Sequence, residues 1–268
     1  MSALLPQWKE YTVTLETISP LHIGATRDMF TSIENSIVRL QNQAIVPSTT
    51  LKGAWRNQIE RFLIGEYFDA SKKEWRKAGV QPCIPGRASD DEKRILNDKQ
   101  WVEARKRVEI REYREYKEPC TYNKYGDPIC PACYLLGAQT LLGFVRVPFL
   151  KLAEGQGRTD EELYSLRIDR ETETGVEGAN RSWYVVNEKI KFVGTLQVLQ
   201  RDDLRHWTLG QARTLGARGK VDRWLDDPAW TAQVIYDKLI KGCLESIQII
   251  GGFRSKDCGK VKITVTPL

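Results

Sequence analysis

Polar and apolar residues alternate near the start of the chain. Residues 10–17 (EYTVTLET) alternate in the manner of a half-buried strand, and a turn follows at residues 19–24. A second strand is expected near residues 36–40. Ser48 or Thr49 is positioned to cap a helix. This helix carries apolar residues at helical spacing, namely Leu51, Ala54, Trp55, Ile59, Phe62 and Leu63.

The second half of the chain ends in a helix and a strand. Residues 141–147 and 190–198 are expected to form strands. An amphipathic helix follows, with Ile235, Leu239, Cys243, Leu244 and Ile247 at helical spacing. The last strand places Val261, Ile263 and Val265 on one face and Lys260, Lys262 and Thr264 on the other. This order of elements predicts an α+β fold: a ferredoxin-like (RRM-like) split βαβ core with large insertions.

Two polar segments interrupt the predicted core. Residues 65–133 form a charged, cysteine-bearing insertion, and residues 155–188 are polar and turn-rich, with hairpin character around residues 175–179. Residues 201–232 carry three tryptophans among basic residues. A chain of 268 residues can bury a sizeable core, so we expect one elaborated domain over residues 1–268.

Composition restricts the compartment and the class of partner. The 41 basic residues exceed the 35 acidic residues, for a net charge of +6, and so modest an excess means that any nucleic-acid surface is local. No stretch of 18 uncharged apolar residues occurs, so no membrane span is expected. Residues 1–6 lack the basic start and apolar core of a secretory signal. We therefore expect a cytoplasmic protein whose six cysteines are thiols or metal ligands.

Three cysteines have the spacing of a metal site. Cys120 precedes Cys130 and Cys133, and two cysteines separated by two residues can bind the same tetrahedral zinc ion. Cys83 is the candidate fourth ligand. A closed structural Zn²⁺ site is the favoured interpretation, and a buried cluster of free thiols or a redox pair are the alternatives. The chain has only two histidines, and His22 is expected to order the turn after the first strand.

Two segments have the composition of phosphate-binding sites. The helix start offers free backbone N–H groups and the positive end of the helix dipole, and Lys52 and Arg56 share one of its faces. Trp55 lies beside them, in position to stack on a sugar or base. The glycine-rich loop at residues 251–261 adds the basic side chains Arg254, Lys256 and Lys260. The alternatives are a capped helix with a solvated basic face and a turn with solvated lysines.

Residues 19–24 read SPLHIG, residues 45–56 read IVPSTTLKGAWR, and residues 251–261 read GGFRSKDCGKV. Together, and in this order, they resemble the repeat-associated mysterious protein (RAMP) superfamily of CRISPR-associated proteins. Residues 130–137 (CPACYLLG) and 168–178 (beginning IDRET) more narrowly resemble the backbone subunits of type III effector complexes. The chain departs from the family pattern where Ser48 replaces a glycine and where Asp257 and Cys258 interrupt the terminal loop.

The resemblance implies that the chain binds guide (CRISPR) RNA, with target RNA and other subunits of an antiviral effector complex as partners. RAMP proteins hold guide-RNA phosphates with the helix start and the glycine-rich loop, through contacts that carry no base code. The corresponding residues here are His22, Ser48, Thr49, Lys52, Trp55, Arg56, Gly251, Gly252, Arg254, Ser255 and Lys256. In type III backbone subunits a thumb-like hairpin pushes between guide and target. Residues 155–188 are similar to it, with Arg167 and Arg170 as RNA-binding residues.

The sequence leaves open whether the chain also cuts RNA. Type III backbone subunits can cut target RNA with a loop aspartate and a divalent ion such as Mg²⁺. Glu34 occupies the matching position, and Asp28 is a nearby carboxylate on the same loop. A purely structural RNA-binding subunit is the competing interpretation. A guide-RNA processing endoribonuclease fits the scarcity of histidine poorly, and a non-CRISPR zinc-containing nucleic-acid-binding protein fits poorly because no Cys-Cys-His-His spacing occurs.

Overall fold

The computed structural model describes residues 5–25, 36–69, 71–72, 74–83, 120, 128–138, 140–165, 168–174, 181–215 and 219–268. The chain divides into two compact units. Unit 1 comprises Met1–Glu10, Trp55–Arg146 and Gln197–Cys243, and unit 2 comprises Tyr11–Ala54, Val147–Leu196 and Leu244–Leu268. Both units are therefore assembled from segments that lie far apart in the sequence.

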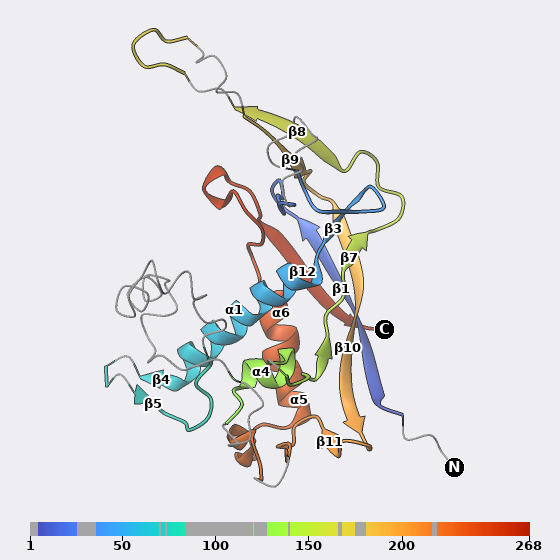
Figure 1. The fold of residues 1–268 in the computed structure, drawn as a ribbon, viewed down its shortest axis with the longest axis vertical. Helices are drawn as coiled ribbons and strands as arrows, with labels where there is room; N and C mark the ends of the chain where they lie inside the picture. Colours follow the sequence, from blue (N-terminus) through green and yellow to red (C-terminus); the bar gives the residue numbers. More distant parts are fainter. Residues whose placement is uncertain are drawn as a thin grey trace. The chain divides into compact units, whose positions relative to one another are not determined.

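An eight-stranded sheet is the main β structure. Its strands follow one another in the order β12 (Val261–Pro267), β1 (Gln7–Thr17), β10 (Lys191–Asp202), β7 (Leu150–Leu152), β3 (Gln43–Val46) and β2 (Arg39–Leu40). β6 (Val145–Arg146) and β11 (Trp207–Thr208) also pair with β10. β1 and β12 run antiparallel, from Tyr11 opposite Pro267 to Thr17 opposite Val261, and Figure 1 shows these first and last strands side by side in blue and red.

The alternation of the terminal strands predicts their faces correctly. Val261, Ile263 and Val265 of β12 are buried, whereas Lys262 and Thr264 are exposed. The expected second strand is shorter than the segment at residues 36–40, because only β2 forms a ladder there. Ile37 contributes an isolated bridge to Gly24 instead.

The first helix, α1 (Ser48–Tyr67), buries a stripe spaced four residues apart: Leu51, Trp55, Ile59 and Leu63. It begins at Ser48 itself, so Ser48 and Thr49 lie in its first turn, and the expectation that one of them caps the helix from outside is wrong. The Pro47 carbonyl accepts the N–H groups of Thr50 and Leu51 at 3.1 Å, so Pro47 occupies the position that immediately precedes the helix.

The closing helix contains a π-helical stretch where an ordinary amphipathic helix was expected. It runs through α5 (Ala232–Val234), the π-helix η3 (Ile235–Gly242) and α6 (Cys243–Glu245). Trp55 Nε1 donates to the Leu239 carbonyl at 2.8 Å, which an α-helix would use to accept the Cys243 N–H. The Cys243 N–H reaches the carbonyls of Ile240 and Lys238 instead. The Trp55 side chain thus takes the place of the Cys243 N–H at the Leu239 carbonyl.

Two hairpins and three short helical turns complete the described elements. β4 (Phe68–Asp69) pairs with β5 (Glu74–Trp75), and β8 (Asp160–Ser165) pairs with β9 (Arg181–Val186), the hairpin drawn in olive and brown in Figure 1. The helical turns are α4 (Pro131–Leu136), η2 (Arg223–Asp226) and η4 (Arg254–Lys256). The hairpin turn expected around residues 175–179 lies outside the described residues. None of the helices in the described ranges has the length and apolar content needed to cross a membrane.

Candidate metal centre and nucleic-acid interface

Four cysteines meet in unit 1. The Sγ atoms of Cys83, Cys120, Cys130 and Cys133 all lie within 4.8 Å of one another, and all four residues are buried. Cys83 Sγ is 3.4 Å from Cys133 Sγ. Tetrahedral zinc with Zn–S bonds of about 2.3 Å requires sulfurs about 3.8 Å apart, so the arrangement is consistent with a structural zinc site. The prediction that Cys83 joins the other three in one cluster is confirmed.

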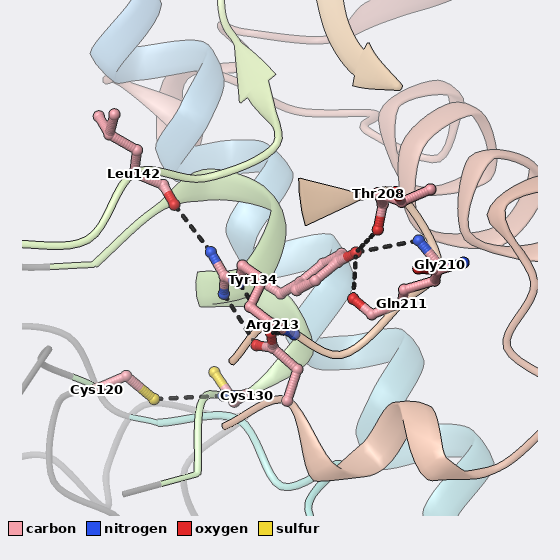
Figure 2. Close-up of polar contacts among 9 residues, drawn as sticks. Cys120, Cys130, Tyr134, Leu142, Thr208, Gly210, Gln211 and Arg213 are labelled. Atoms are coloured by element: carbon pink, nitrogen blue, oxygen red, sulfur yellow. Dashed lines mark hydrogen bonds and ion pairs between the residues drawn. The ribbon is translucent and has the colours of Figure 1, made fainter. Parts of the chain in front are cut away.

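The start of α4 brings two of these cysteines together. Cys130 immediately precedes the helix, Pro131 occupies its first turn, and Cys133 lies on the same turn. The Cys130 N–H donates to Cys120 Sγ at 3.4 Å, the contact dashed in Figure 2. A backbone N–H directed at a sulfur stabilises the thiolate form, which is the form that binds metal.

Arg56 contacts the cysteine cluster, which differs both from the expected phosphate-binding role and from its alternative, a solvated basic face. Its Nη1 lies 3.4 Å from Cys133 Sγ, and its Nη2 lies 3.1 Å from Cys83 Sγ. Its Nε donates to Glu60 Oε1 at 3.0 Å. The side chain is only 14% exposed. Burial lowers the pKa of Arg56, but the charges of Cys133 and the other nearby acidic groups raise it by more, so the guanidinium stays charged.

Hydrogen bonds among the four cysteines shift their pKa values in opposite directions: the pKa of Cys83 is lowered to about 7, whereas those of Cys120 and Cys133 are raised. Side-chain hydrogen bonds from Cys120 and the other two cysteines hold the pKa of Cys130 well below its usual range, and the charge of Arg56 lowers that pKa further. Four clustered sulfur donors, two of which are shifted towards the thiolate, have the chemistry that Zn²⁺ prefers. The residues present therefore fit this metal.

Trp55 also differs from its sequence-based interpretation. Its side chain is fully buried, and its Nε1 donates to the Leu239 carbonyl. A ring with no exposed face cannot stack on a nucleobase, so Trp55 is a core residue of unit 1 in this structure. The helix-spaced apolar pattern of residues 51–63 already contained this signal.

Tyr134 fixes α4 against the segment that follows β11. The Gly210 N–H donates to Tyr134 Oη at 3.0 Å, and the carbonyls of Thr208 and Gln211 lie 3.4 and 3.3 Å from the same oxygen. Figure 2 shows the phenol pointing into this group of backbone atoms. Every residue of α4 is buried. The helix that carries Cys133 is therefore held by both packing and hydrogen bonds.

Sequence reasoning missed a buried ion pair beside α4. Arg213 Nε and Nη2 donate to the two Asp222 carboxylate oxygens at 2.8 and 2.9 Å, and both side chains have no exposed surface. Arg213 Nη1 donates to the Leu142 carbonyl at 3.0 Å, as Figure 2 shows. The guanidinium also lies 4.9 Å from the centre of the Tyr134 ring. Only the tryptophans and basic residues of the segment at 201–232 hinted at such a site.

The glycine-rich loop in unit 2 requires glycine where it approaches His22. Gly251 has φ +86°, and a Cβ at this position would clash with the His22 carbonyl oxygen. The same carbonyl accepts the Gly252 N–H at 2.8 Å. His22 is buried, and its Nδ1 lies 2.7 Å from the Tyr184 carbonyl of β9. His22 therefore orders the turn after β1, as expected.

Aromatic packing joins the loop to the β8–β9 hairpin. The ring of Phe253 lies 4.4 Å from that of His22 and 5.6 Å from that of Trp183, centre to centre. Lys256 Nζ lies 4.0 Å from the centre of the Trp183 ring. Arg254 Nε donates to the Gly251 carbonyl at 3.1 Å. Arg254 and Lys256 are both exposed, and they extend from a constrained backbone.

Other contacts hold the base of the same hairpin. Arg39 of β2 forms an ion pair with Asp160 of β8 and lies over the Tyr184 ring.

Arg170 is exposed in a turn where Asp169 Oδ1 accepts the N–H of Thr172 at 3.0 Å. Arg167 lies outside the described residues.

The remaining predicted site residues divide into two groups. Thr49, Lys52 and Ser255 are exposed, and Ser48 is half-buried. The two candidate carboxylates, Asp28 and Glu34, lie outside the described residues. The Ala25 N–H donates to the Ser36 carbonyl at 2.9 Å, so the described residues on either side of that segment are close together.

The fold and these sites define an α+β protein with a buried four-cysteine cluster and a glycine-rich basic loop against a hairpin. Residues 14–255 match the family model of the RAMP superfamily, and the chain belongs to that superfamily. Among curated proteins, no relative matches the chain. Membership of the RAMP superfamily implies a CRISPR-associated, RNA-binding role, with CRISPR RNA and other CRISPR-associated subunits as general partners.

Proposed function

We propose that this RAMP protein is a backbone subunit of a cytoplasmic type III effector complex, where it binds guide-RNA phosphates and displays the guide for pairing with target RNA. The packing of the glycine-rich loop against the β8–β9 hairpin carries this proposal. In the proposed role, exposed Arg254 and Lys256 bind phosphates, and the hairpin projects between guide and target. Lys52, exposed at the fifth position of α1, contributes a further cation near the helix N-terminus.

The sheet supports a ferredoxin-like core as the framework of this proposal. β12, β1, β10 and β7 are neighbours in that order. If β7 is the second core strand and β10 the third, the order of the four core strands is 4-1-3-2. The two core connections then run through α1 and through the closing helix, as a split βαβ arrangement requires.

We also propose that the four cysteines bind one structural Zn²⁺. Cys83, Cys120, Cys130 and Cys133 would supply four thiolates and close the coordination sphere. The ion would fix the segment at residue 83 and the cysteine at 120 to the start of α4. Its contribution is to folding, because a closed four-sulfur site leaves no position for substrate.

Cleavage of target RNA is an additional part of the proposal and rests on Asp28 and Glu34. A carboxylate on this segment would arrange a divalent ion and the 2′-hydroxyl of the target. Guide processing by the same chain is the weaker alternative. His22 is buried, and a general base must reach the proton that it abstracts from the substrate.

The RNA-binding proposal is tested by charge reversal. Lys52→Glu combined with Arg254→Glu should abolish guide retention when the complex is purified from its host. Lys220→Glu combined with Lys241→Glu is the matched control, since both lysines are exposed outside the proposed surface and the net charge changes equally. RNA at the wild-type level in a folded Lys52/Arg254 double variant would contradict the proposed surface.

A further inference from the structure

The contact between Arg56 and the cysteines is a specific one. The guanidinium of Arg56 has three nitrogens, and each has a separate partner. Nε donates to Glu60 Oε1, Nη1 points to Cys133 Sγ, and Nη2 lies 3.1 Å from Cys83 Sγ and 3.2 Å from the Cys83 carbonyl oxygen. Glu60 is one helical turn beyond Arg56 on α1 and only 8% exposed. The planar fork of Arg56 is thus fixed along both of its edges.

The contact with Arg56 would compensate the negative charge of the metal-bound cysteine cluster. Four thiolates around one Zn²⁺ carry a net charge of −2, and burying such a charge is costly unless cations or N–H donors compensate it. The fixed guanidinium supplies one positive charge and directs donors at two of the four sulfurs. Hydrogen bonds to ligand atoms both orient the ligands and stabilise the metal-bound form.

We propose that Arg56, held in place by Glu60, is a positioning residue of the four-cysteine metal site, which fixes the sulfurs of Cys83 and Cys133 and raises the affinity for zinc. This inference rests on the proposed zinc site. A lysine could supply the charge but not the flat fork that reaches two sulfurs and a carbonyl together. Arg56 would therefore serve the metal centre and not the RNA phosphates.

Zinc affinity is the quantity to measure, by competition between the purified protein and a chromogenic zinc chelator. Arg56→Gln should weaken zinc binding by about 10–100-fold. Arg56→Lys should give an intermediate loss, since the charge remains and the fork is absent. Arg61→Gln is the matched control, because Arg61 is an exposed arginine of the same helix that bonds Asn57. The control should bind zinc like the wild type.

A second readout covers the case in which Arg56→Gln folds poorly. Co²⁺ substituted into the site of the Arg56→Lys variant should give a thiolate-to-cobalt absorption band shifted in energy from the wild-type band, because the hydrogen bonds to two sulfurs have changed. Unchanged zinc affinity in Arg56→Gln, or an unchanged cobalt spectrum in Arg56→Lys, would overturn the inference. Wild-type protein without zinc would overturn it together with the zinc site, while RNA retention would still test the proposed function separately.

Discussion

Trp55 and Arg56 are neighbours in the chain, and both looked like RNA-binding residues. The structure places the Trp55 ring against the closing helix and the Arg56 guanidinium against the cysteines. Their partners are at residues 239, 83 and 133, far away in sequence. A basic and an aromatic side chain beside a helix start are thus compatible with either a surface or an interior role, and the tertiary partner decides between them.

Loss of one cysteine should remove the metal and weaken the fold. Cys130→Ser should bind far less than one zinc per chain and unfold at a lower temperature, since a structural ion contributes directly to folding. Metal analysis and a thermal melt measure the two effects. Cys243→Ser, a buried cysteine outside the cluster, should keep its zinc. Equal zinc in the wild type and Cys130→Ser would contradict the assignment.

Breaking the buried ion pair of Arg213 and Asp222 should lower the free energy of unfolding far more than breaking an exposed ion pair. Asp222→Asn leaves Arg213 charged and unpaired in the interior, so the free energy of unfolding should fall by about 3–5 kcal/mol. Lys220→Met breaks an exposed ion pair with Asp226 and should cost less than about 1 kcal/mol. Denaturant unfolding of both variants provides the comparison. Similar falls in the free energy of unfolding in the two variants would contradict the predicted importance of the buried pair.

Burial raises the pKa of the Cys243 thiol to about 12. Because this pKa lies above the usual thiol value, the group remains protonated in the folded protein at pH 8, and the thiolate that reacts with iodoacetamide is scarce. Cys243 should therefore be alkylated slowly in the folded protein and rapidly after denaturation. Mass spectrometry of the peptide that contains Cys243 measures both rates. Rapid alkylation of the native protein would contradict its burial.

At the scale of elements, the conformation of the glycine-rich loop requires glycine at residue 251 more strictly than at residue 252. Gly251→Ala introduces a Cβ at φ +86° that clashes with the His22 carbonyl, and it should destabilise the protein by more than about 1 kcal/mol. Gly252→Ala is the matched control: a Cβ there would lie 3.5 Å from the His22 ring, an ordinary contact, and its φ is not in the left-handed region. Thermal melts that rank the two variants equally would contradict this account of the loop.

The terminal strands, α1 and the pairing of Cys130 with Cys133 could be predicted because local patterns determine them, whereas Cys83, the candidate fourth ligand, joins them from a distant segment. Val261, Ile263 and Val265 alternate with polar residues, and the stripe from Leu51 to Leu63 has helical spacing. The π-helix could not be predicted, because apolar spacing does not distinguish it from an α-helix and the contact of Trp55 with the Leu239 carbonyl is long-range. The ion pair of Arg213 and Asp222 likewise joins two segments whose sequence shows only mixed charge.

At the scale of the whole molecule, the proposed cleavage needs to be tested in the proposed effector complex. If the subunit cuts target RNA, the reaction should require Mg²⁺ or a similar ion and leave a 2′,3′-cyclic phosphate, because the 2′-hydroxyl is the nucleophile. Asp28→Ala and Glu34→Ala, each tested in the assembled complex, should identify the carboxylate by loss of the cut opposite this subunit. Cleavage that survives both changes would exclude these residues. If the wild-type complex binds the target without cutting it opposite this subunit, the subunit has a purely structural role.

The central claim is that unit 2 binds the guide RNA through the glycine-rich loop and the start of α1. Electron microscopy of the protein co-purified with its native RNA tests this claim most directly. The account predicts guide phosphates within hydrogen-bonding distance of Lys52, Arg254 and Lys256, with the β8–β9 hairpin beside the guide. RNA density on another face, with these three side chains in solvent, would contradict it.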